Sequence, residues 1–101
     1  QHGYVTMPAT AITAADSVVF TTGFRPRKVV VENVTDRIRI EWYEGMAANS
    51  CIKTAANGTR TLEVTGGNGG ITVSANGFSV LQNATLAVVV ASKVLAFEAI
   101  A

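Results

Sequence analysis

The sequence predicts an all-β protein, an antiparallel β-sandwich of about eight short strands with an extended N-terminal arm. Residues 37–43 alternate between apolar and polar side chains, which is the period of a half-buried strand. Short segments rich in β-branched and aromatic residues recur along the chain, with Gly, Pro, Asn and Asp between them. No stretch of about 12 residues keeps a helical period between capping residues, so we expect little or no helix.

A β-hairpin of residues 28–34 and 37–43 is predicted to form the middle of the fold. The first segment is rich in β-branched residues, and Thr35 and Asp36 are turn residues. One register places apolar side chains opposite apolar ones and an acid opposite a base. It pairs Val29 with Trp42, Val31 with Ile40, and Glu32 with Arg39. A slip of one residue would lose all of these pairs, so the pattern specifies the register.

Residues 1–16 are interpreted as an arm, and residues 17–101 as the sandwich domain. Ala and Thr dominate the arm, and Pro8 blocks regular pairing in its middle, although a short strand is possible at 11–13. The arm is either a frayed terminus or a segment that orders against a neighbouring subunit. Because Asp16 is its only charged residue, we favour the second interpretation.

Turn residues delimit the other predicted strands. Gly23 to Pro26 form a corner that leads into the central hairpin. Asn57-Gly58 is the strongest hairpin-turn signal, and it joins an expected edge strand at 51–54 to a strand at 60–64. Further strands are expected at 17–21, 71–74, 78–81, 86–90 and 93–98. The continuously apolar segment 86–90 is typical of a strand that is covered on both faces.

Composition suits one domain with part of its surface covered by another chain. The chain has 101 residues, of which 49% are hydrophobic and only 15% are charged, so we expect a homo-oligomer. The net charge of +1 favours neither a nucleic acid nor an anionic membrane as partner. A single cysteine excludes an intrachain disulfide. No apolar run has the length of a transmembrane helix, and no signal peptide is recognisable.

Candidate catalytic and cofactor sites are weak throughout the sequence. His2 is the only histidine, so Ser-His and Cys-His pairs and metal clusters have no support. The glycine loop at 66–70 precedes a strand and lacks the Lys that a phosphate loop supplies. Glu41 and Glu44 point to opposite faces of one strand, and Cys51 is typical of a small buried hydrophobe. We therefore expect no enzyme, no metal and no cofactor.

The basic residues do not form a nucleic-acid platform. Five of the eight lie between Arg25 and Arg39, close to Phe24. Acidic residues, among them Glu32 and Asp36, are interleaved with them and neutralise the patch. A solvated or protein-binding face is the better interpretation.

Four stretches, which together cover most of residues 20–99, carry a family resemblance. They are Gly23-Phe24-Arg25-Pro26-Arg27-Lys28-Val29-Val30-Val31-Glu32-Asn33, Glu41-Trp42-Tyr43-Glu44-Gly45-Met46, the glycine loop before Ile71-Thr72-Val73, and Ser92-Lys93-Val94-Leu95-Ala96-Phe97-Glu98-Ala99. The chain resembles small β-structured virion proteins of tailed bacteriophages, and most of all their head decoration (cement) proteins. The resemblance implies a jelly-roll-like sandwich, often trimeric, on the outside of a capsid.

We therefore expect a virion protein that is made in the bacterial host cytoplasm, binds the major capsid protein and stabilises the shell. The alternative is a tail, fibre or baseplate domain that binds a host-surface carbohydrate or another tail protein. The sequence leaves the choice between head and tail open, as it does the host and the copy number. Residues expected at the partner interface are Tyr4, Val5, Met7, Ile12, Phe24, Arg25 and Arg27.

Overall fold

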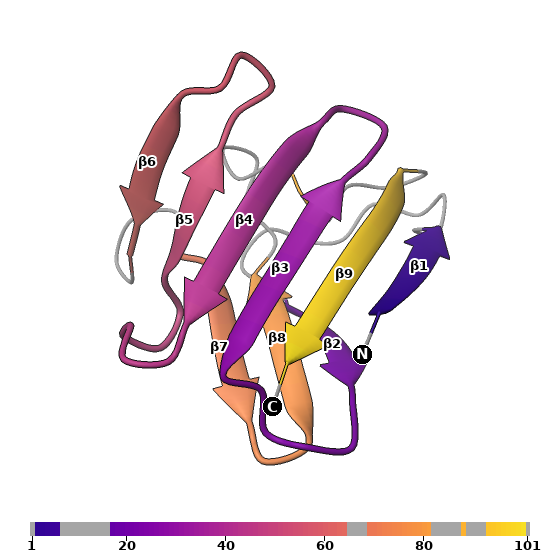
Figure 1. Ribbon diagram of the computed structural model, residues 1–101, viewed down its shortest axis with the longest axis vertical. Helices are drawn as coiled ribbons and strands as arrows, with labels where there is room; N and C mark the ends of the chain where they lie inside the picture. Colours follow the sequence, from indigo (N-terminus) through magenta and orange to yellow (C-terminus); the bar gives the residue numbers. More distant parts are fainter. Residues whose placement is uncertain (1, 7–16, 65–68, 82–87, 89–92, 101) are drawn as a thin grey trace.

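A computed structural model shows nine β-strands in two antiparallel sheets that face each other (Figure 1). The structure describes residues 2–6, 17–64, 69–81, 88 and 93–100, and none of these is helical. The strands are β1 (His2–Thr6), β2 (Ser17–Thr21), β3 (Lys28–Asn33), β4 (Ile38–Tyr43), β5 (Cys51–Thr54), β6 (Arg60–Glu63), β7 (Ile71–Ser74), β8 (Gly77–Leu81) and β9 (Val94–Ile100). The all-β, antiparallel sandwich predicted from the sequence is confirmed, with nine strands in place of about eight.

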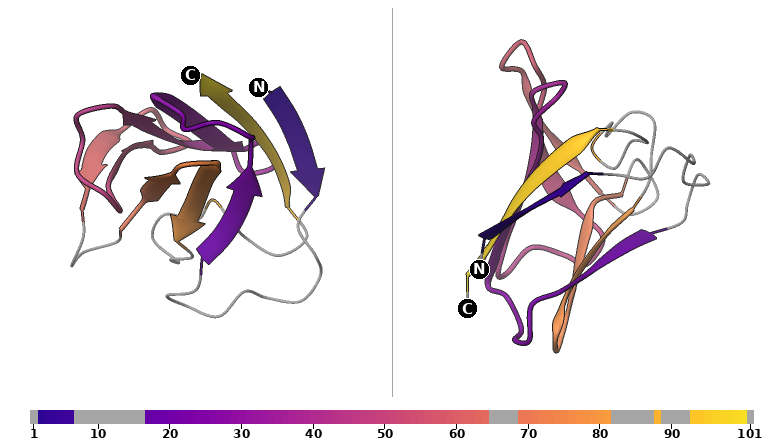
Figure 2. Two further views of the ribbon diagram at one scale, coloured as in Figure 1. Left: turned by 90° about the horizontal axis from the view of Figure 1, so that it is seen from below. Right: turned by 90° about the vertical axis from the view of Figure 1, so that its right-hand side faces the viewer.

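The larger sheet has the strand order β1-β9-β3-β4-β5-β6, and the smaller has the order β2-β8-β7. Strands β3 to β6 form a meander of successive neighbours. Strand β1 pairs with β9, and β2 pairs with β8. Strands from the two ends of the chain are therefore neighbours in both sheets. The smaller sheet covers one face of the larger one, and no other described part of the chain covers the opposite, open face (Figure 2).

The β3–β4 hairpin has the predicted register, with Val29 opposite Trp42 and Val31 opposite Ile40. The turn is longer than predicted by two residues, Val34 and Arg37. Arg37 has a φ of 61°, so it belongs to the turn, and β4 begins at Ile38. The prediction that Arg37 belongs to the strand was wrong, because Arg37 closes the hairpin in a left-handed conformation. The alternation of apolar and polar residues alone does not reveal this.

Hydrogen bonds tie this turn to the start of β9. The Val34 N–H donates to the Val94 carbonyl at 2.9 Å, and the Val94 N–H donates to Thr35 Oγ1 at 3.1 Å. Lys93 Nζ lies 3.3 Å from Asp36 Oδ1. The tip of the central hairpin is therefore attached to a strand that lies about sixty residues later in the sequence.

The core lies between the two sheets. Its buried hydrophobic residues are Phe20, Val29, Val31, Ile40, Trp42, Cys51, Ile71, Phe78, Val80, Val88, Leu95 and Ala99. Phe20 stacks on Phe78 with ring centroids 4.8 Å apart, and Phe97 packs against both rings. Trp42 is only 6% exposed, so its predicted burial is confirmed.

Two sequence-based expectations about the sheet edges were wrong. Strand β5 is not an edge strand, because it pairs with β4 on one side and with β6 on the other. The Asn57-Gly58 turn carries β6 past it to the sheet edge. Residues 2–6 are not free of the domain, since β1 pairs with β9 of the same chain along its whole length. The strand expected at 11–13 lies outside the described residues, and of the segment 86–90 only Val88 is described, where it is buried.

The β4–β5 connection joins the two sheets at one end of the sandwich. Ser50 forms an isolated bridge with Ile71, and the Asn49 side chain accepts a hydrogen bond from the Gly70 N–H at 3.1 Å. A Cβ at Gly70 would lie 2.5 Å from the Ser50 carbonyl carbon, so this approach requires glycine. The loop at 66–70 therefore ends in a structural contact, and its first three residues lie outside the described part of the chain.

Candidate functional site

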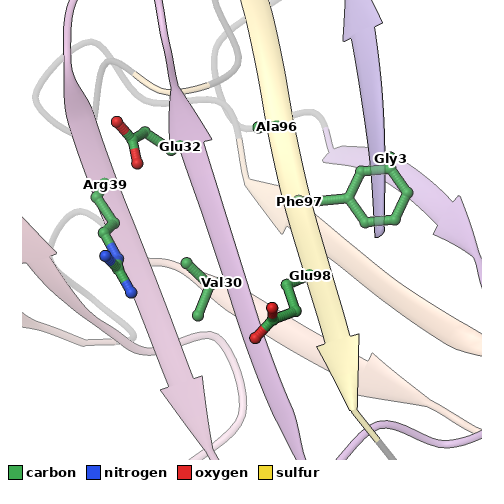
Figure 3. Close-up of a pocket in the computed structure, with 7 residues that line it drawn as sticks. All are labelled: Gly3, Val30, Glu32, Arg39, Ala96, Phe97 and Glu98. Carbon is green, nitrogen blue, oxygen red and sulfur yellow. The ribbon is translucent and has the colours of Figure 1, made fainter. Parts of the chain in front are cut away.

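The outer face of the larger sheet carries a shallow hollow of about 220 Å³ (Figure 3). Val29 and Val31 of β3 point into the core, so the alternate residues Val30 and Glu32 point away from it. This outer-face hollow is lined by Gly3, Val30, Glu32, Arg39, Ala96, Phe97 and Glu98. Four strands contribute to it, which makes it a depression in a broad sheet surface.

Phe97 connects this hollow to the core. Its ring is half-buried, 5.3 Å from the Phe20 ring, and in Figure 3 it lies beside Gly3 of β1. A Cβ at Gly3 would lie 2.5 Å from Phe97 Cε1, so only glycine lets β1 pass this close to the ring. Because Gly3 has no side chain, β1 can run close beside Phe97, and the two residues together line this side of the outer-face hollow.

A cluster of paired charges lies beside the hollow and is centred on Glu41. The Glu41 residue is 8% exposed, and its Oε1 lies 3.3 Å from Arg39 Nε and 3.7 Å from Arg60 Nη2. The Tyr43 hydroxyl donates a short hydrogen bond to the same carboxylate. This hydrogen bond, together with burial, raises the pKa of the Tyr43 hydroxyl above its ordinary value of 10.0. Glu32 lies opposite Arg39 as predicted, but the ion pair of Arg39 is with Glu41.

Glu41 and Glu44 each have cationic partners of their own. The Glu41 carboxylate lies near two guanidinium groups, and Glu44 pairs separately with Arg27 at 3.3 Å. The two carboxylates therefore belong to two separate groups of ion pairs.

A second hollow, of about 370 Å³, lies at the end of the sandwich near the β2–β3 connection. This end hollow is lined by Arg25, Pro26, Arg27, Trp42 and Glu44. Backbone hydrogen bonds hold its rim, because the Arg27 N–H donates to the Ile100 carbonyl and the Glu44 N–H donates to the Arg27 carbonyl, both at 2.7 Å. Trp42 belongs to the core, so the end hollow is where the core meets two exposed arginines.

The structure brings together only part of the predicted interface. Arg25 and Arg27 share the end hollow, whereas the neighbouring Phe24 is half-buried against the core. Tyr4 and Val5 lie in β1, opposite residues of β9, on another side of the molecule. Met7 and Ile12 lie outside the described residues.

Cys51 is a buried core residue, as the sequence indicated. Burial, with a smaller contribution from Glu63, raises the pKa of its thiol to about 12. Its Sγ lies 3.8 Å from the Gly69 carbonyl oxygen as a weak donor. In the described ranges, no three His, Cys, Asp or Glu residues are placed to hold a metal ion, and no helix has the length and hydrophobicity to cross a membrane.

Sequence reasoning missed a set of exposed apolar side chains. Leu62 is 66% exposed and Val64 is 46% exposed, both at the β6 edge, and Ile100 is exposed at the end of β9. A sequence signal for the exposure of Leu62 was present in the hairpin around Asn57-Gly58. Its register pairs the apolar Ile52 with Leu62 and the polar Lys53 with Thr61. The polar pair lies on the core side of the sheet and the apolar pair on the open side.

Comparison with known proteins leaves the geometry as the only guide to function. No family model, curated protein or solved structure matches the chain. The sandwich, its open sheet face and the two hollows described above are therefore the structural features from which a function can be inferred.

Proposed function

We propose that this protein is a non-enzymatic head decoration (cement) protein of a tailed bacteriophage, which binds the outside of the capsid and stabilises it. The observation that carries the proposal is the open face of the six-stranded sheet. On this face Arg39, Glu41 and Arg60 pair with one another. Val30 and Leu62 are apolar side chains of the same face. Such a surface suits a protein partner better than a small charged substrate.

The charge pattern supports a protein partner in particular. Glu41 is compensated by Arg39 and Arg60, and Arg27 is compensated by Glu44. Covering such a face costs less than covering isolated charges, because each charge keeps its partner. A low overall charge of 15% fits a chain whose surface is largely covered in its working state.

The proposed mechanism is stabilisation by mass action. A protein that binds the assembled shell and not the free subunits favours the shell by its binding free energy. The proposed partner is the major capsid protein, and the proposed location is the capsid exterior. The family resemblance adds the proposal that three copies associate at each site.

The proposal is tested by adding the purified protein to heads prepared without it. We expect saturable binding and an increase in the temperature at which the heads release DNA, because binding favours the closed shell. The variant Val30→Glu should bind more weakly, since it adds a negative charge to the open face beside Glu32 and Glu98. Arg37→Glu is the matched control, because Arg37 is exposed in the turn that follows β3.

Electron microscopy with a labelled antibody distinguishes the head from the tail. Label on the capsid supports the proposal, whereas label confined to the tail contradicts it and favours the alternative tail, fibre or baseplate domain.

A carbohydrate site of such a domain needs an exposed aromatic platform. In the described part of the chain, Tyr43 is exposed beneath Lys28 Nζ, 5.8 Å from its ring centroid, while Phe24 is half-buried against the core.

A further inference from the structure

Strand β6 is an edge of the six-stranded sheet, and within the described residues its only strand neighbour is β5 (Figure 1). An edge strand presents N–H and C=O groups that can pair with another chain. Proteins block such edges with Pro, bulges, charged side chains or very short strands. Strand β6 has four residues and carries Arg60 and Glu63, but it contains no Pro and pairs with β5 in an unbroken register. The edge therefore has the form of a template for a further strand.

The alternation of hydrogen bonds along the β5–β6 ladder identifies which residues of β6 direct their N–H and C=O groups away from β5. The Ala55 N–H donates to the Thr59 carbonyl at 2.9 Å, which makes Ala55 and Thr59 a hydrogen-bonded pair of the hairpin. Because such pairs alternate in an antiparallel ladder, Thr61 also directs its peptide groups toward β5. Arg60 and Leu62 then direct theirs to the open side. The series ends at Val64, whose carbonyl accepts a hydrogen bond from the Gly69 N–H at 3.1 Å.

The side chains of β6 add an apolar contact to this open backbone. Leu62 is opposite Ile52 on the outer face of the sheet, and Ile52 is in turn opposite Glu41. This row across the sheet ends at Leu62, which is 66% exposed. The other face of β6 is polar, with Thr61 Oγ1 donating to Glu63 Oε2 at 2.7 Å. A partner strand must therefore bring an apolar side chain on the outer face and a polar one on the inner face.

We propose that β6 pairs antiparallel with β6 of a second copy of this chain, about a two-fold axis at Leu62. This register places Leu62 opposite Leu62 of the partner subunit and Arg60 opposite Val64 of the partner subunit. The row Ile52-Leu62 then continues into the same row of the second copy, so both outer faces lie on one side of a twelve-stranded sheet.

Other registers fit less well. Centring the pair on Thr61 would place Leu62 opposite an arginine of the partner subunit, and the apolar contact would be lost. A shift by one residue would place the apolar face of one copy beside the polar face of the other. Around Leu62, no like charges meet, because Arg60 faces a valine and keeps its own partner Glu41 at 3.7 Å. The chain is therefore complementary to itself at this edge.

This two-fold contact is separate from any three-fold contact and does not depend on the function of the protein. By itself it produces dimers, and combined with a trimer it produces hexamers. A strand of four residues forms a small interface, so the association is expected to be weak and to depend on concentration.

Disulfide trapping in the full-length protein tests the contact. In Leu62→Cys, the two new thiols would lie on opposing residues with Cα atoms about 5.5 Å apart, which a disulfide can span. Native Cys51 does not interfere, because it is fully buried. The matched control is Val19→Cys, which is 72% exposed on the edge strand β2 of the other sheet. We expect covalent dimers from Leu62→Cys under mild oxidation and only a background level from Val19→Cys.

Sedimentation equilibrium of Leu62→Lys provides a second readout. The substitution is expected to leave the exposed β6 folded, which circular dichroism checks, and to weaken dimerisation by about tenfold or more through like-charge repulsion at the axis. Val19→Lys should associate like the wild type. The proposal is overturned if Leu62→Cys traps no more dimer than Val19→Cys, or if Leu62→Lys associates as the wild type does.

Discussion

Trp42 shows at the scale of one residue how burial and hydrogen bonding act together. Its side chain belongs to the core cluster and is 6% exposed, while its Nε1–H donates to the Ala47 carbonyl at 3.2 Å. The indole thus has both an apolar environment and a partner for its one polar atom. It also closes the end hollow from the core side.

The substitution Trp42→Ala is expected to lower the free energy of unfolding by roughly 3–5 kcal/mol, because it leaves a large cavity in the core. The Ala47 carbonyl keeps a partner, since it also accepts a hydrogen bond from the Ser50 hydroxyl. Denaturant titration measures this loss. Val19→Ala, at a 72% exposed position, is the control and should change stability by less than about 0.5 kcal/mol. Native Trp42 fluorescence should be blue-shifted and poorly quenched by iodide; a red-shifted, freely quenched signal would contradict the burial.

Tyr43 is expected to make stability depend on pH in the alkaline range. The hydrogen bond to Glu41 and burial raise its pKa in the folded state above the ordinary 10.0, so the folded state holds the proton more tightly than the unfolded state does. The resulting stabilisation is present below pH 10 and is lost as the pH rises through the folded-state pKa. Glu41→Gln should shift the Tyr43 absorbance titration to lower pH in a Tyr4→Phe background. An unchanged titration would show that Glu41 is not its cause.

At the scale of strands, paired elements are joined by a few close backbone contacts. The β3–β4 hairpin is attached to β9 through Val34, Thr35 and Asp36. On the other side of the sandwich, β2 and β8 lie so close that a Cβ at Gly77 would clash with the Phe20 carbonyl oxygen. The stacked Phe20 and Phe78 rings depend on this approach.

Gly77→Ala is therefore expected to destabilise the protein by about 1–3 kcal/mol, because β2 must move away from β8. Thermal unfolding by circular dichroism measures the effect. Val19→Ala is the control, because Val19 lies on β2 at a 72% exposed position and its truncation places no atom between β2 and β8. Equal losses at the two positions would show that strand spacing at Gly77 is not limiting.

At the scale of the whole molecule, the first strand, β1, and the last strand, β9, lie side by side at one edge of the larger sheet. Strand β1 pairs with β9 from His2↔Glu98 to Thr6↔Val94, and β9 separates it from β3. The N-terminal segment therefore contributes to the domain, and Phe97 packs beside Gly3 because of it.

Deleting residues 1–6 should leave a folded sandwich, because β1 is an edge strand, but it removes the pairing of β1 with β9. We expect a loss of about 1–2 kcal/mol and a decrease in Tm of roughly 4–16 °C for a domain of this size. Removal of Gln1 alone is the control. An unchanged Tm would favour the interpretation of residues 1–16 as an arm that adds nothing to the isolated domain.

The sequence by itself determined most of the strands and the central register, but not β1. The alternation around Ile38, Ile40 and Trp42 predicted the hairpin, because side chains on a pleated strand alternate between a buried and an exposed face. Local turn signals placed most of the other strands, since the Asn-Gly turns and the corner from Gly23 to Pro26 restrict the backbone over only a few residues.

Tertiary structure decided what local patterns do not encode. The pairing of β1 with β9 joins residues from the two ends of the chain, and no local signal in Tyr4 or Val5 specifies it. The ion pair of Arg39 with Glu41, in place of Glu32, depends on side-chain packing beyond the register. Leu62 faces outward because the smaller sheet covers only one side of the larger sheet. Alternation shows that a strand has two faces, but only the packed fold determines which of them is covered.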